Sequence, residues 1–210
     1  EEAKVVIVAT GASPKRGGFE NEEQFIGKGV STCAVCDGFF YRNQEVAVIG
    51  GGDTALEEAI YLSTIAKKVY LIHRRDKFRA SPTTIKRVLN NEKIEILYNS
   101  KVKKVYGNQF VDGLIIDKNG SEINLKVPGV FVFVGNIKNT DILKNKNGEF
   151  ICEMCEDGSV CVDLSMKTSI EGLFAVGDIR KDSVKQVICS AGDGAVSALQ
   201  AVKYLDSLKS

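Results

Sequence analysis

The 210-residue sequence has a single histidine, no long apolar run and almost no net charge, and each shortage excludes a class of function. His73 alone leaves little material for a histidine-based catalytic triad. No apolar stretch approaches the roughly 20 residues of a membrane span. The acidic start also lacks the charged and apolar regions of a signal peptide. Because 28 basic residues nearly balance 27 acidic ones, no global charge favours nucleic acid or an anionic membrane. We therefore expect a globular cytoplasmic protein.

The six cysteines are too few and too unevenly spaced for the disulfide framework of a small secreted protein. In a reducing compartment, two thiols separated by two residues are typical of redox or metal-binding sites. Cys33 and Cys36 form such a pair, and Asp37 directly after it can pass protons as thiolates form and leave. The spacing alone leaves three interpretations open: an easily reduced disulfide, half of a zinc site, or two unreactive thiols.

The other four cysteines are Cys152, Cys155, Cys161 and Cys189. Cys152 and Cys155 repeat the two-residue spacing, but their segment is typical of loop and strand. It offers no histidine and no fourth nearby thiol for a tetrahedral zinc site. We therefore interpret all four as incidental core or surface thiols, and we expect no metal site.

A glycine-rich turn follows the buried strand predicted for residues 45–50. Gly50, Gly52 and Ala55 match the G-x-G-x-x-G/A spacing, in which the glycines let the backbone approach a pyrophosphate at a helix N-terminus. Asp53 and Thr54 complete the turn. A helix over residues 56–62 and a strand over residues 68–73 follow, so the motif lies in a strand–helix–strand unit. This context favours a dinucleotide site over a glycine turn without a ligand.

Basic residues follow the strand that ends this unit. An NAD site usually carries an acid here, about 20 residues past the glycines, which binds the ribose hydroxyls. This chain instead has His73, Arg74 and Arg75, with Arg79 shortly after. Since guanidinium groups match a phosphate in charge and geometry, the pattern predicts the 2′-phosphate of NADPH. The alternative is a solvated basic surface.

The remaining pattern predicts further strands and one long helix. Short strands at residues 94–98, 102–106, 113–117 and 122–127 predict a small antiparallel layer on the dinucleotide domain. Residues 4–10, 129–135 and 172–177 are apolar strands that could share one sheet. Gly177 and Asp178 then place a carboxylate at the carboxyl end of a strand, where it suits a polyol hydroxyl. Residues 186–205 predict a long, mostly apolar helix.

Taken in order, these features resemble one family along the whole chain, the low-molecular-weight, bacterial-type thioredoxin reductases. The shared elements are Ala9-Thr10-Gly11, Cys33-x-x-Cys36-Asp37-Gly38, the turn at residues 50–55, His73-Arg74-Arg75 with Arg79-Ala80, Gly177-Asp178, and Gln186 before Gly192-Asp193-Gly194. Their order and combination are more specific than any single motif.

The resemblance implies an α/β protein with two Rossmann-like, three-layer domains, in which an NADPH domain is inserted into an FAD domain. The implied bounds are residues 1–13 and 129–210 for the partial FAD domain, and residues 14–128 for the NADPH domain with its dithiol. The implied NADPH ligands are Gly50, Gly52, Asp53, Thr54, Ala55, His73, Arg74, Arg75 and Arg79. The implied FAD ligands are Thr10, Gly11, Gly177, Asp178, Gln186 and Val187.

The resemblance also implies a reaction, in which electrons pass from NADPH through FAD to the disulfide of Cys33 and Cys36 and on to thioredoxin. In family terms, Cys36 faces the flavin, Cys33 reacts with the partner disulfide, and Asp37 supplies the proton. The NADPH domain would rotate about hinges near Ser13 and Pro128. A homodimer is expected from the family.

Members of the family begin with a further strand, glycine-rich turn and helix that bind the ADP half of FAD, and this sequence has none of them. We therefore expect the chain to correspond to the carboxyl-terminal two-thirds of such an enzyme, and to bind NADPH but not FAD. Two alternatives stay open: the flavoprotein reductase of a peroxiredoxin, and an NADPH-binding module without catalysis. The segment Cys36-Asp37-Gly38-Phe39-Phe40 favours a thioredoxin reductase over the first alternative.

Overall fold

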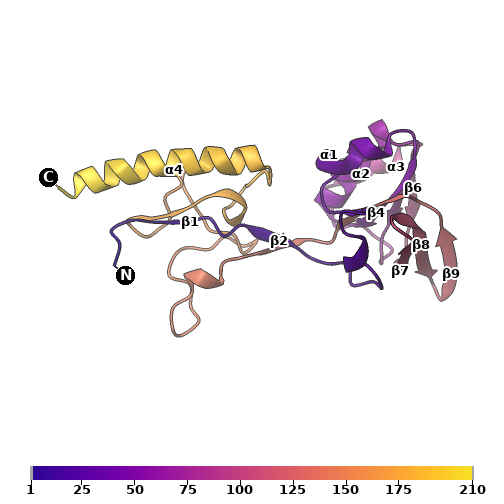
Figure 1. Ribbon diagram of the computed structural model, residues 1–210, viewed down its shortest axis with the longest axis horizontal. Helices are drawn as coiled ribbons and strands as arrows, with labels where there is room; N and C mark the ends of the chain where they lie inside the picture. The colour runs from indigo at the N-terminus through magenta and orange to yellow at the C-terminus, as the bar shows by residue number, and fades with distance from the viewer. Residues whose placement is uncertain (1, 210) are drawn as a thin grey trace. The chain divides into compact units, whose positions relative to one another are not determined.

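The computed structural model describes residues 2–209 and divides the chain into two compact units (Figure 1). Unit 1 combines the segments Glu1–Ser13 and Asn136–Ser210, and unit 2 is the continuous segment Pro14–Gly135. Unit 2 is therefore an insertion into unit 1. The insertion predicted for residues 14–128 begins at the same residue but stops before the last strand of unit 2.

Unit 2 is built on a five-stranded parallel sheet in the order β3-β10-β4-β5-β6. Its strands are β3 (Val30–Ser31), β4 (Glu45–Gly50), β5 (Lys68–Ile72), β6 (Ile94–Leu97) and β10 (Gly129–Phe133). Helix α2 (Asp53–Ile65) connects β4 to β5, and helix α3 (Pro82–Leu89) connects β5 to β6. This strand order with helical crossovers is the Rossmann-like α/β fold predicted from the sequence.

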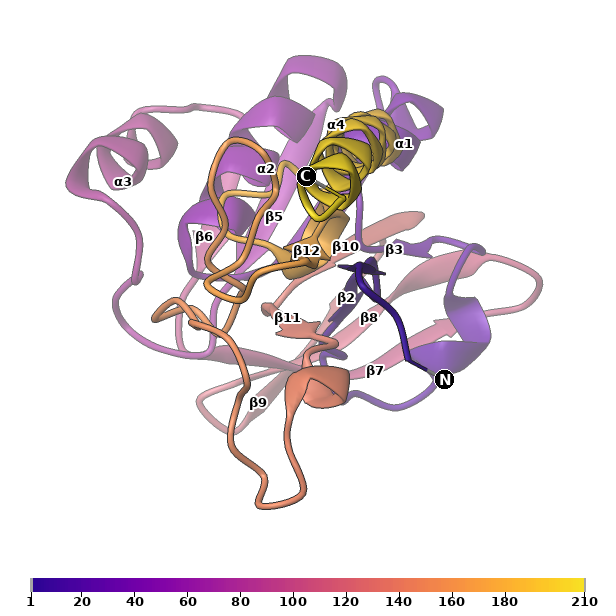
Figure 2. The ribbon, with the colours of Figure 1, turned by 90° about the vertical axis from the view of Figure 1, so that its left-hand side faces the viewer.

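The two faces of this sheet carry different layers (Figures 1 and 2). On one face, Leu56 and Leu62 of α2 share a buried cluster with Val48 of β4. On the other face, Leu114 shares a buried cluster with Val130 of β10. This second layer is an antiparallel sheet of β7 (Ser100–Gly107), β8 (Val111–Lys118) and β9 (Ser121–Leu125). Unit 2 therefore has three layers with two apolar interfaces.

The predicted hairpin and three of the four strands predicted for the antiparallel layer are confirmed. The prediction is wrong for residues 94–98, because β6 pairs in parallel with β5 and belongs to the five-stranded sheet. Strands β8 and β9 pair in register from Leu114 with Leu125 to Lys118 with Ser121. The turn between them consists of Asn119 and Gly120, whose φ angles are 52° and 86°. Positive φ at both central residues matches the right-handed twist of the strands.

A second strand assignment is also wrong. Residues 129–135 were expected to join the sheet that begins with residues 4–10, but β10 lies between β3 and β4 of unit 2. The apolar run predicted a buried strand correctly, but a parallel strand buried on both faces looks the same in either sheet. The rest of that assignment is confirmed, because β1 (Val6–Val8) pairs in parallel with β12 (Leu173–Ala175).

Unit 1 is less regular. Helix α4 (Val187–Ser207) matches the long helix predicted for residues 186–205, and its Ala201 shares a small buried cluster with Phe174 of β12. Unit 1 also contains the 3-10 helices η3 (Asp141–Leu143) and η4 (Gly177–Ile179). Within residues 2–209, no helix has both the length and the apolarity needed to cross a membrane.

The two connections between the units lie side by side. Strand β2 (Ala12–Pro14) pairs with β11 (Asn136–Lys138), and the N–H of Lys15 donates to the carbonyl of Gly135 at 2.9 Å. The second connection therefore falls at residues 135–136 rather than at the predicted hinge near Pro128, because β10 belongs to unit 2.

Candidate functional site

Cys33 and Cys36 form a disulfide at the start of the short helix α1 (Ala34–Asp37), and their Cα atoms are 5.3 Å apart. The N–H of Cys36 donates to Cys33 Sγ at 3.2 Å, and the N–H of Cys33 donates to Ser31 Oγ at 3.1 Å. Ala34 is fully buried, whereas Cys36 is exposed. No group of metal-binding side chains occurs in the described residues. Of the three interpretations, the structure therefore has the reducible disulfide.

Asp37 ends α1, where its N–H donates to the carbonyl of Cys33 at 3.2 Å. Its negative charge acts on the hydroxyl of Tyr41, in the following 3-10 helix η2 (Gly38–Tyr41). Burial raises the pKa of the Tyr41 hydroxyl, and the negative charge of Asp37 raises it further. The Tyr41 ring packs edge-on against Phe131 of β10, with ring centroids 5.5 Å apart. The acid next to the disulfide is thus held near the parallel sheet.

Large apolar side chains are exposed around the disulfide. Val35, Phe39 and Phe40 are 54%, 66% and 73% exposed. We call these three residues the dithiol surface. The guanidinium carbon of Arg42 lies 5.3 Å from the centre of the Phe39 ring, which adds a positive charge at its edge. Exposed aromatic groups beside a reactive disulfide suit contact with another protein.

The glycine turn between β4 and α2 fits a pyrophosphate. A Cβ on Gly50 would come within 2.5 Å of both Ala55 and the carbonyl of Phe133, so the turn leaves no room for a side chain there. A Cβ on Gly52, by contrast, would meet no described atom within 4 Å. Gly52 is the N-cap of α2, and no side chain of the described residues caps this end. Open space and uncapped N–H groups at a helix start are what a phosphate requires.

Two backbone contacts tie the basic loop after β5 to this turn. The N–H of Arg79 donates to the carbonyl of Gly51 at 2.7 Å, and the N–H of Ser81 donates to Asp53 Oδ1 at 2.7 Å. Asp53 therefore acts on the loop as well as on the helix start. The contacts fix Arg79 next to the turn.

His73 has a structural position in the same loop. Its ring is buried, with Nδ1 3.0 Å from the carbonyl of Gly50 and Nε2 2.9 Å from the carbonyl of Lys77. A Cβ on Gly51 would overlap the ring, at 2.1 Å from Nδ1. The imidazole thus links the glycine turn, through Gly50, to the basic loop, through Lys77. Its predicted contact with NADPH stays a prediction.

The side chains of Arg74, Arg75 and Arg79 are exposed, and none forms a salt bridge in the described part of the chain. Three unpaired guanidinium groups beside a phosphate-type turn fit a second phosphate. A cavity of about 250 Å³ adjoins Arg74, but not Arg75 or Arg79. It is lined by Arg74, Asn99, Lys101, Asp117, Asn119 and Gly120.

The dithiol and the glycine turn share one edge of the sheet. Cys33 follows β3, the turn follows β4, and His73 follows β5. Since these strands are parallel, their carboxyl ends lie at the same edge, which is where open α/β sheets bind ligands. Helix packing supports the same arrangement, because Ala34 of α1 shares a buried cluster with Ala55 of α2.

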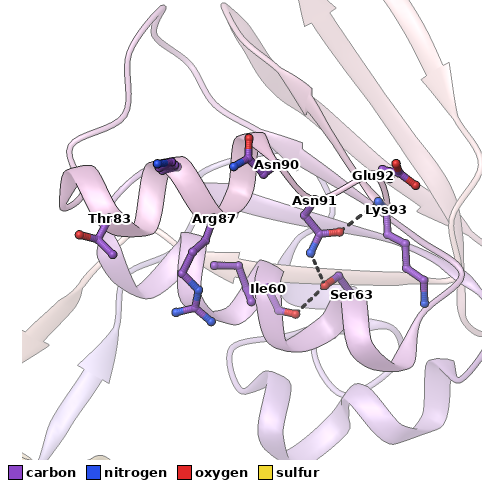
Figure 3. Close-up of a pocket in the computed structure, with 9 residues that line it drawn as sticks. Ile60, Ser63, Thr83, Arg87, Asn90, Asn91, Glu92 and Lys93 are labelled. Carbon is purple, nitrogen blue, oxygen red and sulfur yellow. Dashed lines mark hydrogen bonds between the residues drawn. The ribbon is translucent and has the colours of Figure 1, made fainter.

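A larger cavity, of about 750 Å³, lies elsewhere, between the C-terminal half of α2 and α3 (Figure 3). Two of its polar side chains, Ser63 and Asn91, already bond to each other. Asn91 Nδ2 donates to Ser63 Oγ at 2.8 Å, and Ser63 Oγ donates to the carbonyl of Ile60 at 2.6 Å. We assign no site to this groove.

Glu58 on α2 was not singled out from the sequence. Its Oε2 is buried and has no hydrogen-bond partner among the described residues. Burial raises the pKa of this carboxyl, and the neighbouring charge of Glu57 raises it further. Only a structure reveals such a group, because its helical position is an ordinary one.

In unit 1, the predicted flavin residues Gly177 and Asp178 lie in η4, directly after β12. Ser183 Oγ donates to Asp178 Oδ1 at 2.9 Å, and Lys138 Nζ donates to the Asp178 carbonyl at 3.0 Å. Burial lowers the pKa of Lys138, and the positive charge of Lys185 lowers it further. The Asp178 turn thus lies among charged groups of both signs, because Asp157 also acts on Lys138.

The other predicted flavin residues are close to the chain connections or to the start of α4. Thr10 Oγ1 donates to the carbonyl of Asn139 at 2.6 Å, and the N–H of Asn139 donates to the carbonyl of Gly11 at 3.0 Å. Gln186 is the N-cap of α4, and Val187 begins the helix in an exposed position. The predicted flavin contacts of these residues stay predictions.

Asp193, in the element Gly192-Asp193-Gly194, has a role that the sequence pattern did not reveal. Arg180 donates to both carboxylate oxygens of Asp193, from Nε at 2.6 Å and from Nη2 at 2.9 Å. The N–H of Gly177 donates to the same carboxylate at 3.0 Å. These hydrogen bonds hold the pKa of Asp193 below its usual range, Arg180 being the main cause. The buried pair fastens α4 to the turn that carries Asp178.

The expectation of four incidental thiols is wrong for two of them. Cys155 forms a disulfide with Cys161, and Cys152 and Cys189 are free. The two-residue spacing of Cys152 and Cys155 was misleading, because the turn at residues 156–159 brings Cys161 back beside Cys155.

The fold and these sites define a dinucleotide-binding redox protein with a disulfide at the edge of its parallel sheet. The family model described as pyridine nucleotide-disulphide oxidoreductase matches residues 1–194. The chain belongs to this family and, within it, to the thioredoxin reductases, which confirms the resemblance drawn from the motifs. Proteins of this group use NADPH and FAD.

Individual relatives support this assignment. The chain is 54% identical to the thioredoxin reductase of Helicobacter pylori, over 98% of this chain and 67% of that protein. It is 47% identical to the thioredoxin reductase of Buchnera aphidicola subsp. Baizongia pistaciae, over 96% of this chain and 63% of that protein. The crystal structure of thioredoxin reductase from Streptococcus pyogenes superposes with a TM-score of 0.88 at 40% identity, over 97% of this chain and 66% of that one. The chain thus spans about two thirds of the length of the relatives it matches.

Proposed function

We propose that this chain carries the NADPH-binding part, the redox disulfide and part of the FAD site of a thioredoxin-disulfide reductase. One observation above all supports the proposal. The disulfide of Cys33 and Cys36 lies at the same edge of one parallel sheet as a glycine turn shaped for a pyrophosphate. A zinc site or an inert thiol pair would not need that neighbour.

The proposed NADPH contacts follow from the shape and charge of unit 2. The turn at Gly50 and Gly52, with Asp53, Thr54 and Ala55 at the start of α2, would take the pyrophosphate on its N–H groups. Arg74, Arg75 and Arg79 would take the 2′-phosphate, because their charges are unpaired within the described residues. His73 would contribute by holding the turn and the loop together.

When bound, NADPH and FAD would supply the two electrons that reduce the disulfide. Reduction of the disulfide takes two electrons and two protons and leaves Cys33 and Cys36 as thiols. In the proposed exchange, the Cys33 thiolate attacks the disulfide of thioredoxin, which forms a mixed disulfide and releases one thioredoxin thiol. Cys36 then attacks Cys33 Sγ, so that the Cys33–Cys36 disulfide forms again and the second thioredoxin thiol leaves. The N–H of Cys36, 3.2 Å from Cys33 Sγ, would stabilise the thiolate, and Asp37 would pass the proton.

The dithiol surface supports a protein as the electron acceptor. The exposed side chains of Val35, Phe39 and Phe40 belong to the short helices α1 and η2. The first residues of these helices, Ala34 and Gly38, are buried. Because the backbone is anchored from below, these side chains can bury apolar area against thioredoxin without reordering the site.

Unit 1 would contribute Thr10, Gly11, Gly177, Asp178, Gln186 and Val187 to the flavin. Asp178 suits a ribityl hydroxyl, since its Oδ1 already accepts from a hydroxyl group, that of Ser183. The paired connections β2 and β11 would be the hinges for rotation of unit 2. A homodimer and a cytoplasmic location are part of the same proposal.

The alternative acceptor is a peroxiredoxin, and kinetics of the full-length protein that contains this chain separate the two. We expect NADPH-dependent reduction of thioredoxin to fall by more than about a thousandfold in Cys33→Ser and Cys36→Ser variants, since each removes the exchange chemistry. Cys189→Ser is the control that keeps the rate. Faster reduction of a peroxiredoxin than of thioredoxin, or turnover without Cys36, would contradict the proposal.

A further inference from the structure

The disulfide of Cys155 and Cys161 spans a tight hairpin in unit 1. The N–H of Cys155 donates to the carbonyl of Ser159 at 2.8 Å, and the N–H of Cys161 donates to the carbonyl of Glu153 at 3.2 Å. Met154 and Val160 are paired in antiparallel fashion between them. Cys155 and Cys161 therefore lie on the same side of the ribbon, diagonal to each other, with Cα atoms 5.4 Å apart. This separation is normal for a disulfide.

The free cysteine nearest to this hairpin in the sequence, Cys152, is less accessible than Cys155 and Cys161. Cys152 is buried in an apolar cluster with Val160 and Ile179, and burial raises the pKa of its thiol. A protonated, buried thiol is a poor nucleophile. Cys155 and Cys161, in contrast, are both partly exposed. The pair in which both cysteines are accessible is therefore Cys155 and Cys161, and not Cys152 and Cys155.

The hairpin also holds the turn that carries Asp178. The N–H of Val160 donates to the carbonyl of Ile179 at 3.0 Å, and the N–H of Lys181 donates to the carbonyl of Val160 at 2.9 Å. Val160 is fully buried and lies within the loop that the disulfide closes. The negative charge of Asp157 at the tip of the hairpin also acts on Lys138, which holds the Asp178 carbonyl. The hairpin and the Asp178 turn are therefore one connected structure.

We propose that Cys155 and Cys161 are a second redox site, whose closure by a low-molecular-weight disulfide tightens the hold of Val160 on residues 177–181. A thiolate of the pair attacks one sulfur of the external disulfide, releasing one thiol and leaving a mixed disulfide. The second cysteine then displaces the other thiol. The pair loses two electrons and two protons, and the external disulfide gains them as two thiols.

The disulfide would strengthen the hydrogen bonds of Val160 with Ile179 and Lys181 by lowering the conformational entropy of the open hairpin. The bond closes the loop over residues 155–161, and this restricts the open states in which Val160 separates from Ile179 and Lys181. The consequence for flavin binding at Asp178 rests on the proposed function. The redox site itself does not, because it needs neither NADPH nor thioredoxin.

The test uses the 210-residue chain with Cys33→Ser and Cys36→Ser, so that one disulfide remains. After reduction and incubation with oxidised glutathione, peptide mapping should find Cys155 linked to Cys161. Hydrogen exchange at Val160 and Lys181 should be about tenfold slower in the oxidised form than in the reduced form. Cys152→Ser added to this background should keep the difference, and Cys155→Ser with Cys161→Ser should abolish it.

Three results would overturn the proposal: a link between Cys152 and Cys155, a lasting glutathione adduct on either cysteine, or equal exchange rates in the two forms. The readouts involve neither the dinucleotide nor the dithiol at Cys33. Failure of this proposal and failure of the proposed reductase function are therefore distinguishable.

Discussion

Helix α2 in unit 2 and helix α4 in unit 1 place their apolar side chains in opposite surroundings. Leu56 and Leu62 of α2 are fully buried against the parallel sheet. On α4, the buried positions are Asp193, Ser197 and Ala201, while Val187, Ile188 and Leu199 are 86%, 76% and 67% exposed. Unit 2 is thus held by a large apolar core, whereas α4 is held mainly by a buried ion pair and small contacts.

This difference shows that different interactions stabilise the candidate site residues in the two units. The NADPH and dithiol positions rest on a core that unit 2 supplies from its own residues. The Asp178 turn depends on single interactions, namely Arg180 with Asp193 and the hairpin at Val160. A substitution in unit 1 should therefore act through one named contact, and a core substitution in unit 2 through lost apolar burial.

The largest expected effect is on the core of unit 2. Leu56→Ala should lower the free energy of unfolding by about 3 kcal/mol, because it removes buried methyl groups and leaves a cavity. The matched change Leu199→Ala on the exposed face of α4 should cost less than about 0.5 kcal/mol. Urea denaturation followed by circular dichroism measures both. Equal losses would remove the contrast between the two helices.

The next effect tests the ion pair of unit 1. Asp193→Asn should destabilise this unit by about 2 kcal/mol at neutral pH, because Arg180 loses its buried partner. The pKa of Asp193 is lowered in the folded state from its ordinary value of 3.8, so its contribution is present above that value. It is lost as the pH falls through the lowered folded pKa. Thermal unfolding from pH 7 to pH 2 would record this loss.

Asp206 provides the control for this prediction. It forms an exposed pair with Lys209 near the end of the same helix, at 2.9 Å. Asp206→Asn should change stability by less than about 0.5 kcal/mol. If Asp193→Asn proved equally harmless, the buried pair would not be what fastens α4.

A smaller effect concerns dinucleotide selectivity. Replacing Arg74 and Arg75 by alanine should raise the Kd of NADPH at least about tenfold, through loss of charged hydrogen bonds, and change the Kd of NADH little. Calorimetric titration of both dinucleotides measures this. Arg87→Ala, on α3 beside the cavity of Figure 3, is the control. Equal weakening of NADPH and NADH would refute the 2′-phosphate assignment.

The smallest expected effect is at Glu58. Its buried oxygen lacks a partner in the described residues, and its pKa is raised in the folded state. The ionised form therefore costs stability above the folded pKa, and the cost disappears below the ordinary value of 4.5. Glu58→Gln should stabilise unit 2 by about 1 kcal/mol at pH 7 and have no effect at pH 4. Destabilisation at pH 7 would indicate that the carboxylate has a partner.

How far the sequence could predict these features depends on whether their cause is local. The turn at Gly50 and Gly52 and the hairpin at Asn119 and Gly120 require particular backbone conformations at fixed spacings, so both were predictable. The sheet of β10 was not, because its apolar residues fit any buried parallel strand. The links between Arg180 and Asp193 and between Cys155 and Cys161 arise from turns that bring residues together. Local pattern does not specify such partners.

Trapping the mixed disulfide would show whether Cys33 exchanges with thioredoxin. Full-length protein with Cys36→Ser would be incubated with a thioredoxin in which the resolving cysteine is serine and the attacking cysteine is activated as a mixed disulfide. We expect a covalent complex joined through Cys33, identified by peptide mass spectrometry. A complex joined through Cys155, Cys161 or Cys189, or no complex at all, would contradict it.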